Sequence, residues 1–420
     1  MDLLPIRQDV AKAPTQKLVG LDALRAFAAL GVVLLHACVP YLTNPMKGLA
    51  WPVQDQSSRM VDCVFWGIEV VIMPVFLVMA GFFAWRTLQT RGPKRLLSSR
   101  ARRLLIPLIF GAVAVLPADL YVWVLGWVGE GLIEPVKLKS LKIEGELGEN
   151  LWGLSHLWFL QYLFLYVAAF ALAFVAITKW SKLARLIPSA KVSAFVLFAI
   201  GSITLCLHPE VVWGFQHSFA PVASKWIYSA TFFAGGLVLG CCNPSLNLLS
   251  QVSRRLVLPA ICLLVATVLL GRWQLATEHQ LAERELSVSL AVAIMTTASA
   301  WMVTLALVGI AAQRTKPIPV AIKYLAAASF WIYLVHHPLL GLIHTDLKLL
   351  LPSVDPIAKM LMAFSLSSSV SIGLYEVFVR RTRLGQWLGF GWQFPQCRQE
   401  QCRQEQEAEF RAETGAQRAA

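Results

Sequence analysis

Arg25 and His36 are the first residues whose types and spacing could support chemistry. They lie eleven positions apart in the apolar stretch GLDALRAFAALGVVLLHACVPY. In an α-helix, eleven steps bring two side chains to within about 20° of the same face and about 16 Å apart along the axis. A guanidinium could then hold an anion at one end while an imidazole moves a proton at the other. A structural interpretation accounts for the spacing equally well. Arg25 could extend its side chain to the lipid headgroups, and His36 could hydrogen-bond to a neighbouring helix.

Other ionisable residues fall in further apolar stretches, where an unpaired charge is costly. They are Glu69, Asp119, His156, His336 and His337. A histidine paired with a carboxylate is a typical general base near neutral pH. Either Glu69 or Asp119 could be the carboxylate that orients His36. Adjacent helical residues point to different faces, so we expect at most one of His336 and His337 to face a shared site.

The segment 86–103 (RTLQTRGPKRLLSSRARR) is basic and contains no acid. It could be an anchor that binds anionic lipid and fixes orientation. It could also bind phosphate groups, which arginine holds with two parallel hydrogen bonds. The two interpretations are compatible.

Motifs for other chemistries do not occur. The sequence contains no HExxH, GxSxG, P-loop or GxGxxG pattern, so we expect no metal site and no such nucleotide site. No basic patch with interleaved aromatic residues indicates nucleic-acid binding. Most of the eight cysteines lie in apolar runs and are expected to be structural thiols.

The composition indicates what must position these residues. Of 420 residues, 57% are hydrophobic and 15% are charged, whereas soluble domains carry about 25% charged residues. The mean hydropathy is +0.61. Apolar runs long enough to cross a bilayer fall near 20–41, 61–85, 104–128, 156–178, 192–208, 224–241, 256–273, 286–311, 324–345 and 356–379. The sequence therefore predicts an all-α, multi-spanning membrane bundle of about ten helices.

The distribution of basic residues predicts the orientation. Most of the 37 Lys and Arg fall in the segments that become cytoplasmic if both termini are cytoplasmic, and several Glu fall in the opposite loops. We expect a cytoplasmic N-terminal segment at 1–17, one transmembrane domain at 18–392 and a polar cytoplasmic tail at 393–420.

Five stretches, in this order along the chain, resemble the acyltransferase-3 family of membrane proteins over roughly 18–392. They are GLDALRAFAALGVVLLH, MPVFLVMAGFFAW (with Ala80 where the family usually has Ser), SRARRLLIPLIFG, HLWFLQYLF and SFWIYLVHHPLL. The HLWFL stretch and the ending YEVFVRRTRLGQWLGF are most similar to the subgroup resembling glucan biosynthesis protein C. That subgroup is associated with succinyl transfer to periplasmic glucans.

The resemblance implies transfer of an acetyl or succinyl group from cytoplasmic acyl-CoA to a hydroxyl of a glucan or other envelope carbohydrate at the outer face. Acyl-CoA would be a substrate, with no permanently bound cofactor, and the location would be a bacterial inner membrane. The residues expected to hold the CoA phosphates are Arg25, Arg100, Arg102 and Arg103. The expected catalytic residues are His36, Glu69 and His336. The residues expected to bind the acceptor are Asp119, His156, Trp158 and Tyr333.

In this scheme His36 would act as general base or carry the acyl group briefly. His336 would assist the acceptor or the developing oxyanion. A transporter or flippase whose polar groups line a path is the alternative, although no inverted repeat is evident. A lipid-binding or structural membrane protein is a third possibility.

Overall fold

The structure is a computed structural model of the 420-residue chain. It describes residues 18–46, 49, 51–140, 142, 143, 145–149, 151–179, 189–277, 286–314 and 316–389. The expected segments 1–17 and 393–420 lie outside these residues.

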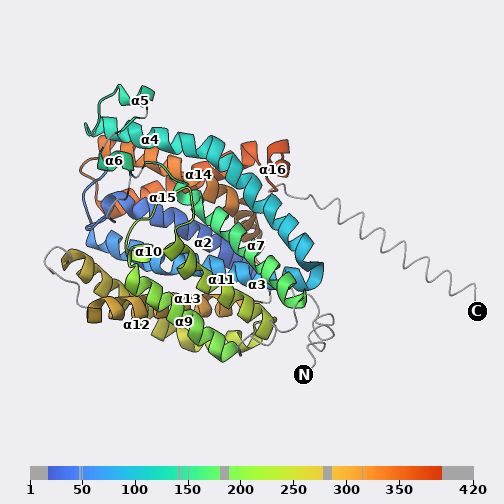
Figure 1. The fold of residues 1–420 in the computed structure, drawn as a ribbon. Helices are drawn as coiled ribbons and strands as arrows, with labels where there is room; N and C mark the ends of the chain where they lie inside the picture. Colours follow the sequence, from blue (N-terminus) through green and yellow to red (C-terminus); the bar gives the residue numbers. More distant parts are fainter. Residues whose placement is uncertain are drawn as a thin grey trace, which may run out of the picture.

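The described part of the chain is helical and contains no strand, which confirms the all-α prediction (Figure 1). The long elements are α2 (Val19–Cys38), α3 (Arg59–Phe110), α4 (Leu116–Gly129), α7 (Trp158–Lys179), α9 (Ala190–Leu207), α11 (Ala223–Cys242), α12 (Asn247–Thr277), α13 (Leu286–Ala312), α14 (Val320–Leu350) and α15 (Pro356–Phe378). The short ones are η1 (Val39–Tyr41), the π-helical η2 (Gly111–Val115), α5 (Lys137–Ser140), α6 (Glu146–Glu149), η3 (Ser155–Leu157), α10 (Glu210–Trp213) and α16 (Arg383–Trp387).

Nine segments of the described residues are long and apolar enough to cross a membrane. One of them, Arg59–Gly129, is 71 residues long and contains both spans expected at 61–85 and 104–128. Its helix is interrupted at Gly92, whose φ of 75° and ψ of 170° are not helical. In Figure 1 the chain runs along α3 to one end of the bundle and returns toward α4. The ten expected spans therefore map onto these nine segments. The cytoplasmic placement of both termini stays a prediction.

The outward surfaces of the helices are apolar. Phe195 on α9, Leu258 on α12 and Leu172 on α7 are each about 70% exposed. Exposed side chains of this kind recur on most of the long helices, whereas soluble monomers rarely expose large contiguous apolar patches. Because lipid solvates such side chains, the protein is a multi-pass membrane protein.

Glycines let the central helices approach closely. A Cβ at Gly81 of α3 would lie 2.1 Å from the carbonyl oxygen of Phe233 on α11. A Cβ at Gly236 of α11 would lie 2.2 Å from the carbonyl oxygen of Val78 on α3. Gly81 and Gly236 thus allow α3 and α11 to pack closely, as small residues commonly do at membrane-helix contacts.

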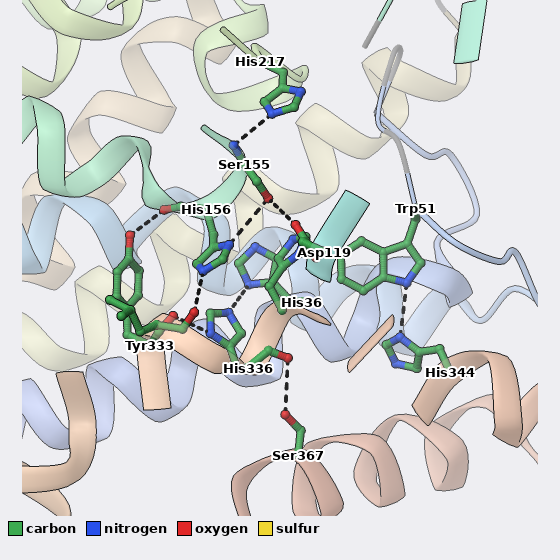
Figure 2. A network of polar contacts seen from close by, with 12 residues as sticks. His36, Trp51, Asp119, Ser155, His156, His217, Tyr333, His336, His344 and Ser367 are labelled. Atoms are coloured by element: carbon green, nitrogen blue, oxygen red, sulfur yellow. Dashed lines mark hydrogen bonds and ion pairs between the residues drawn. The ribbon is translucent and has the colours of Figure 1, made fainter. Parts of the chain in front are cut away.

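Four long helices pack against α2. They are α3, α13, α14 and α15, and α14 also packs against α4. The loop that follows η1 returns to α3 at Arg59, and Ser155 opens η3 directly before α7. The polar side chains of α2, α4, η3 and α14 converge where these elements meet, as Figure 2 shows.

Candidate functional site

His36 of α2 lies at the centre of a cluster of imidazoles (Figure 2). Its Nδ1 is 2.9 Å from the carbonyl oxygen of Val32 and 3.2 Å from Nε2 of His336. The Nδ1 of His336 in turn lies 2.8 Å from the carbonyl oxygen of Tyr333. A carbonyl only accepts, so these partners assign the N–H of both rings to Nδ1. In that state the lone pair of His336 Nε2 accepts from His36, and the lone pair of His36 Nε2 is left for another partner.

His36 is also more accessible than the four histidines packed around it, His156, His336, His337 and His344. His336 is completely buried, and His156, His337 and His344 are at most 5% exposed. His36 is only partly buried. Because a proton acceptor must be reached by the group that it deprotonates, His36 is better placed for this role than the four buried histidines.

His336 and His337 both face His36. The centroids of both rings lie 5.0 Å from the centroid of the His36 ring. The expectation that at most one of the two would face a shared site is therefore wrong. The two side chains leave α14 in different directions, but His36 on the adjacent helix lies between them, so both rings reach it.

The carboxylate of the cluster is Asp119 of α4, and it pairs with His337. Asp119 Oδ1 is 2.7 Å from His337 Nδ1, and Ser155 Oγ donates to Asp119 Oδ2 at 3.0 Å. The backbone N–H of Ser155 donates to His217 Nε2 at 2.9 Å. Ser155 has a φ of +48°, a left-handed conformation that is uncommon for a residue other than glycine. Hydrogen bonds at its side chain and its backbone hold this conformation, as is typical of strained residues at functional sites.

Two residues expected to bind the acceptor, His156 and Tyr333, join η3 to α14. The ring of His156 stacks on the ring of His337 with centroids 4.8 Å apart, and His156 Nε2 donates to the carbonyl oxygen of Leu334 at 3.0 Å. The hydroxyl of Tyr333 donates to the carbonyl oxygen of His156. Both side chains are buried, so their contacts position the cluster.

Three members of the cluster are also potential metal ligands. Asp119, His156 and His337 offer ligand atoms that all lie within 4.8 Å of one another. Local spacing predicted no metal site, and spacing of that kind cannot detect ligands contributed by α4, η3 and α14. Asp119 and His337 hydrogen-bond to each other, and His156 Nε2 donates to the carbonyl oxygen of Leu334.

Glu69 and Trp158 lie in a second polar group, with Lys225 of α11. Glu69 and Lys225 are partly buried and interact electrostatically. The Nζ of Lys225 lies 3.9 Å from the centroid of the Trp158 ring, a cation–π contact. The carboxylate that interacts electrostatically with His36 is Asp119. Of the two carboxylates considered for His36, the structure therefore places Asp119 in the cluster and Glu69 with Lys225.

The basic residues expected to hold phosphates gather at the other end of α2. Arg100 is close enough to Arg25 and Arg103 for their charges to interact. Arg102 and Arg103 are exposed, and Arg100 is partly buried. Arg25 also forms an ion pair of 3.2 Å with Asp22, one turn earlier on the same helix. In the described part of the chain, Arg25, Arg100 and Arg103 thus form a cluster of positive charges, of which only Arg25 is shown paired with an acid.

Residues 18–376 match the model of the acyltransferase-3 family, described as "Acyltransferase domain". The chain belongs to this family. The match starts one residue before α2 and ends near the end of α15, so it contains the whole histidine cluster. No curated protein and no solved structure gives a significant match. The protein is a membrane acyltransferase.

Sequence reasoning did not single out Trp51, Ser155, His217 or His344. Trp51 Nε1 donates to His344 Nδ1 at 3.2 Å, and the Trp51 ring lies 4.8 Å from the ring of His337. Trp51 lies in a loop, so helical spacing does not relate it to any other residue of the site. Ser155 directly precedes the HLWFL stretch, and His344 lies two helical turns after the His336–His337 pair.

Proposed function

We propose that this acyltransferase moves an acetyl or succinyl group from cytoplasmic acyl-CoA to a hydroxyl of a glucan or other envelope carbohydrate at the outer face of a bacterial inner membrane. Membership of the family supports the reaction class. The resemblance of HLWFL and of the C-terminal YEVFVRRTRLGQWLGF to the subgroup of glucan biosynthesis protein C supports the choice of acceptor.

The observation that carries the proposal is the state of His36. Its Nδ1 proton is engaged by Val32 and His336, so Nε2 carries a lone pair on a partly accessible imidazole. The other partly buried imidazole of the network, His217, already accepts from the backbone N–H of Ser155 through its Nε2. A carbohydrate hydroxyl is a weak nucleophile until a base removes its proton. His36 Nε2 is positioned to be that base.

The transfer step balances with this base. The acceptor oxygen attacks the thioester carbonyl carbon as its proton moves to His36 Nε2. The new carbon–oxygen bond forms, the carbon–sulfur bond breaks, and the CoA thiolate leaves. The proton held by His36 then returns to the thiolate, so the products are the ester and free CoA.

His336 and Asp119 support His36 from one side. Both nitrogens of His336 are engaged, with His36 Nδ1 and with backbone carbonyls, so His336 has no free N–H for an oxyanion. Its Nε2 instead accepts from His36 Nδ1 and can share the positive charge that develops there. Asp119 supplies the negative charge of the cluster through His337, which stabilises the same imidazolium.

The donor would enter from the opposite end of α2. Arg25, Arg100 and Arg103 form a basic cluster that suits the phosphates of CoA. Arg25 and His36 lie on the same continuous helix, Val19–Cys38. The thioester must therefore reach about 16 Å along α2, given the rise of 1.5 Å per residue.

Membranes carrying the protein, incubated with labelled acetyl-CoA or succinyl-CoA, test the proposal. His36→Ala should abolish ester formation, and the matched variant His208→Ala, whose exposed imidazole pairs with Glu210, should retain it. Mass spectrometry of envelope glucans after gene deletion should show loss of one acyl decoration. Undiminished ester formation by His36→Ala at normal protein levels would contradict the mechanism. Movement of a carbohydrate without consumption of acyl-CoA would indicate a transporter instead.

A further inference from the structure

Trp51 covers one side of the histidine cluster. It lies in the loop between η1 and α3 and is only 7% exposed. Its indole stacks on the His36 ring at an interplanar angle of 16° and a centroid distance of 6.3 Å. It also contacts His337 edge-on at 4.8 Å and donates from Nε1 to His344. In Figure 2 the indole lies beside Asp119 and His36, at the edge of the cluster opposite Tyr333.

Contacts with α4 and α14 fix the backbone of Trp51 and the ring of Pro52. Trp127 Nε1 of α4 donates to the carbonyl oxygen of Trp51 at 2.8 Å. Pro52 occupies the gap between two glycines on facing helices. A Cβ at Gly126 of α4 would lie 2.5 Å from Pro52 Cβ, and a Cβ at Gly341 of α14 would lie 3.1 Å from Pro52 Cγ. A side chain at either glycine position would crowd Pro52, so the two glycines make room for the loop.

A buried ion pair fixes the next part of the loop. Asp55 Oδ2 lies 2.7 Å from Lys359 Nζ of α15, and the Lys359 side chain is 1% exposed. The backbone N–H groups of Asp55 and Ser58 donate to the carbonyl oxygens of Pro40 and Tyr41. A buried ion pair adds little net stability compared with apolar packing, but it specifies one arrangement of the groups it joins. Here the arrangement is the seating of the Trp51 loop on α15.

Such a cover has a chemical purpose in an acyltransferase. A base that removes the proton of a carbohydrate hydroxyl can equally remove a proton of water. Attack by water would break the carbon–sulfur bond of acyl-CoA and release a free carboxylic acid. Closed sites suppress hydrolysis of this kind by excluding water.

We propose that Trp51 determines specificity for transfer over hydrolysis by excluding water from His36, and that Asp55 and Lys359 hold it in place. The inference rests on the proposed function, and it assigns a role to residues outside the proton-transfer chemistry. Trp51 stacks directly on the His36 ring, while Asp55 and Lys359 are positioning residues that act through the loop.

The test measures two products from one reaction. The purified protein in lipid nanodiscs is given acetyl-CoA or succinyl-CoA with and without a glucose oligosaccharide. Free CoA and acylated oligosaccharide are quantified by chromatography and mass spectrometry. Trp51→Ala should raise the ratio of hydrolysis to transfer at least tenfold, and Trp51→Phe should restore most of the wild-type ratio. Trp273→Ala, a half-exposed tryptophan on α12, is the matched control and should leave the ratio unchanged.

The double variant Asp55→Asn/Lys359→Met should shift the ratio of hydrolysis to transfer in the same direction while leaving Trp51 in place. This variant provides the test if Trp51→Ala does not fold. If hydrolysis and transfer fall together in the Trp51 and Asp55/Lys359 variants, the cover is only structural and the inference is overturned. If the wild-type protein consumes no acyl-CoA under any condition, the proposed function fails, and this inference fails with it. A wild type that transfers and variants with an unchanged ratio would overturn the inference alone.

Discussion

Asp119 Oδ1 and His337 Nδ1 lie 2.7 Å apart, so the carboxylate of the cluster holds His337 and not His36. His36 is held by a backbone carbonyl and a second imidazole instead. The positive charge formed on His36 would therefore be stabilised by Asp119 across the intervening His337 ring, whose centroid is 5.0 Å from that of His36. The negative charge acts on the base without blocking its access.

Asp119→Asn should slow transfer while leaving donor binding unchanged. The amide keeps the size of the carboxylate but removes its charge and places an N–H₂ group where an acceptor stood. Loss of a buried partner costs about 1–3 kcal/mol, which corresponds to a fall in kcat of roughly 5- to 150-fold. The measurement is kcat and the KM for acyl-CoA separately. A rise in KM with unchanged kcat would contradict the electrostatic role of Asp119.

Arg100→Gln should weaken donor binding. Arg100 is partly buried beside Arg25 and Arg103, so a phosphate there would meet several guanidinium groups. Loss of one charged hydrogen bond corresponds to an increase in the KM for acyl-CoA of about tenfold, or ~1.4 kcal/mol. Lys94→Gln removes an exposed charge from the same segment and is the control. Equal effects of both variants would favour the anchor interpretation of the segment.

The fold could be predicted from composition because a membrane span needs only length and apolarity. What the runs did not indicate is how α3 changes direction. Pro74 lies inside α3 without ending it, and the non-helical residue of this helix is Gly92. A proline inside a membrane helix can be accommodated by its neighbours, whereas a φ of 75° is readily adopted only by glycine.

The site could be predicted only in part, because no local sequence pattern determines which residues of different helices come into contact. His36 and Arg25 follow from helical periodicity alone. The pairing of Asp119 with His337 depends on how α4 packs against α14, and the pairing of Glu69 with Lys225 on how α3 packs against α11. Trp51 reaches the cluster through a loop, where neither helical nor strand periodicity applies.

Gly236→Val should destabilise the bundle, because α3 and α11 touch at this position. The added side chain would meet the backbone of Val78 at distances that require the helices to separate. Overpacking of a closely packed interior costs about 1–3 kcal/mol or more, so the melting temperature in detergent should fall. Gly373→Val on α15 has no atom within 4 Å of the added Cβ and is the matched control. Equal melting temperatures for the two variants would mean that the α3–α11 contact is not tight in solution.

Glu69→Gln tests whether Glu69 orients a catalytic group or only balances the charge of Lys225 on α11. Because Glu69 interacts with Lys225 and not with His36, the variant should keep kcat within about threefold of wild type, well short of the 10²–10⁴-fold typical of lost general acid–base catalysis. It should lower stability by about 1–2 kcal/mol, since Lys225 loses its counter-charge in a partly buried site. The double variant Glu69→Gln/Lys225→Met removes both charges and should recover much of that loss. Thermal melting and kcat are measured on all three proteins. A fall in kcat of a hundredfold or more in Glu69→Gln, with normal melting, would instead assign Glu69 to the chemistry at His36.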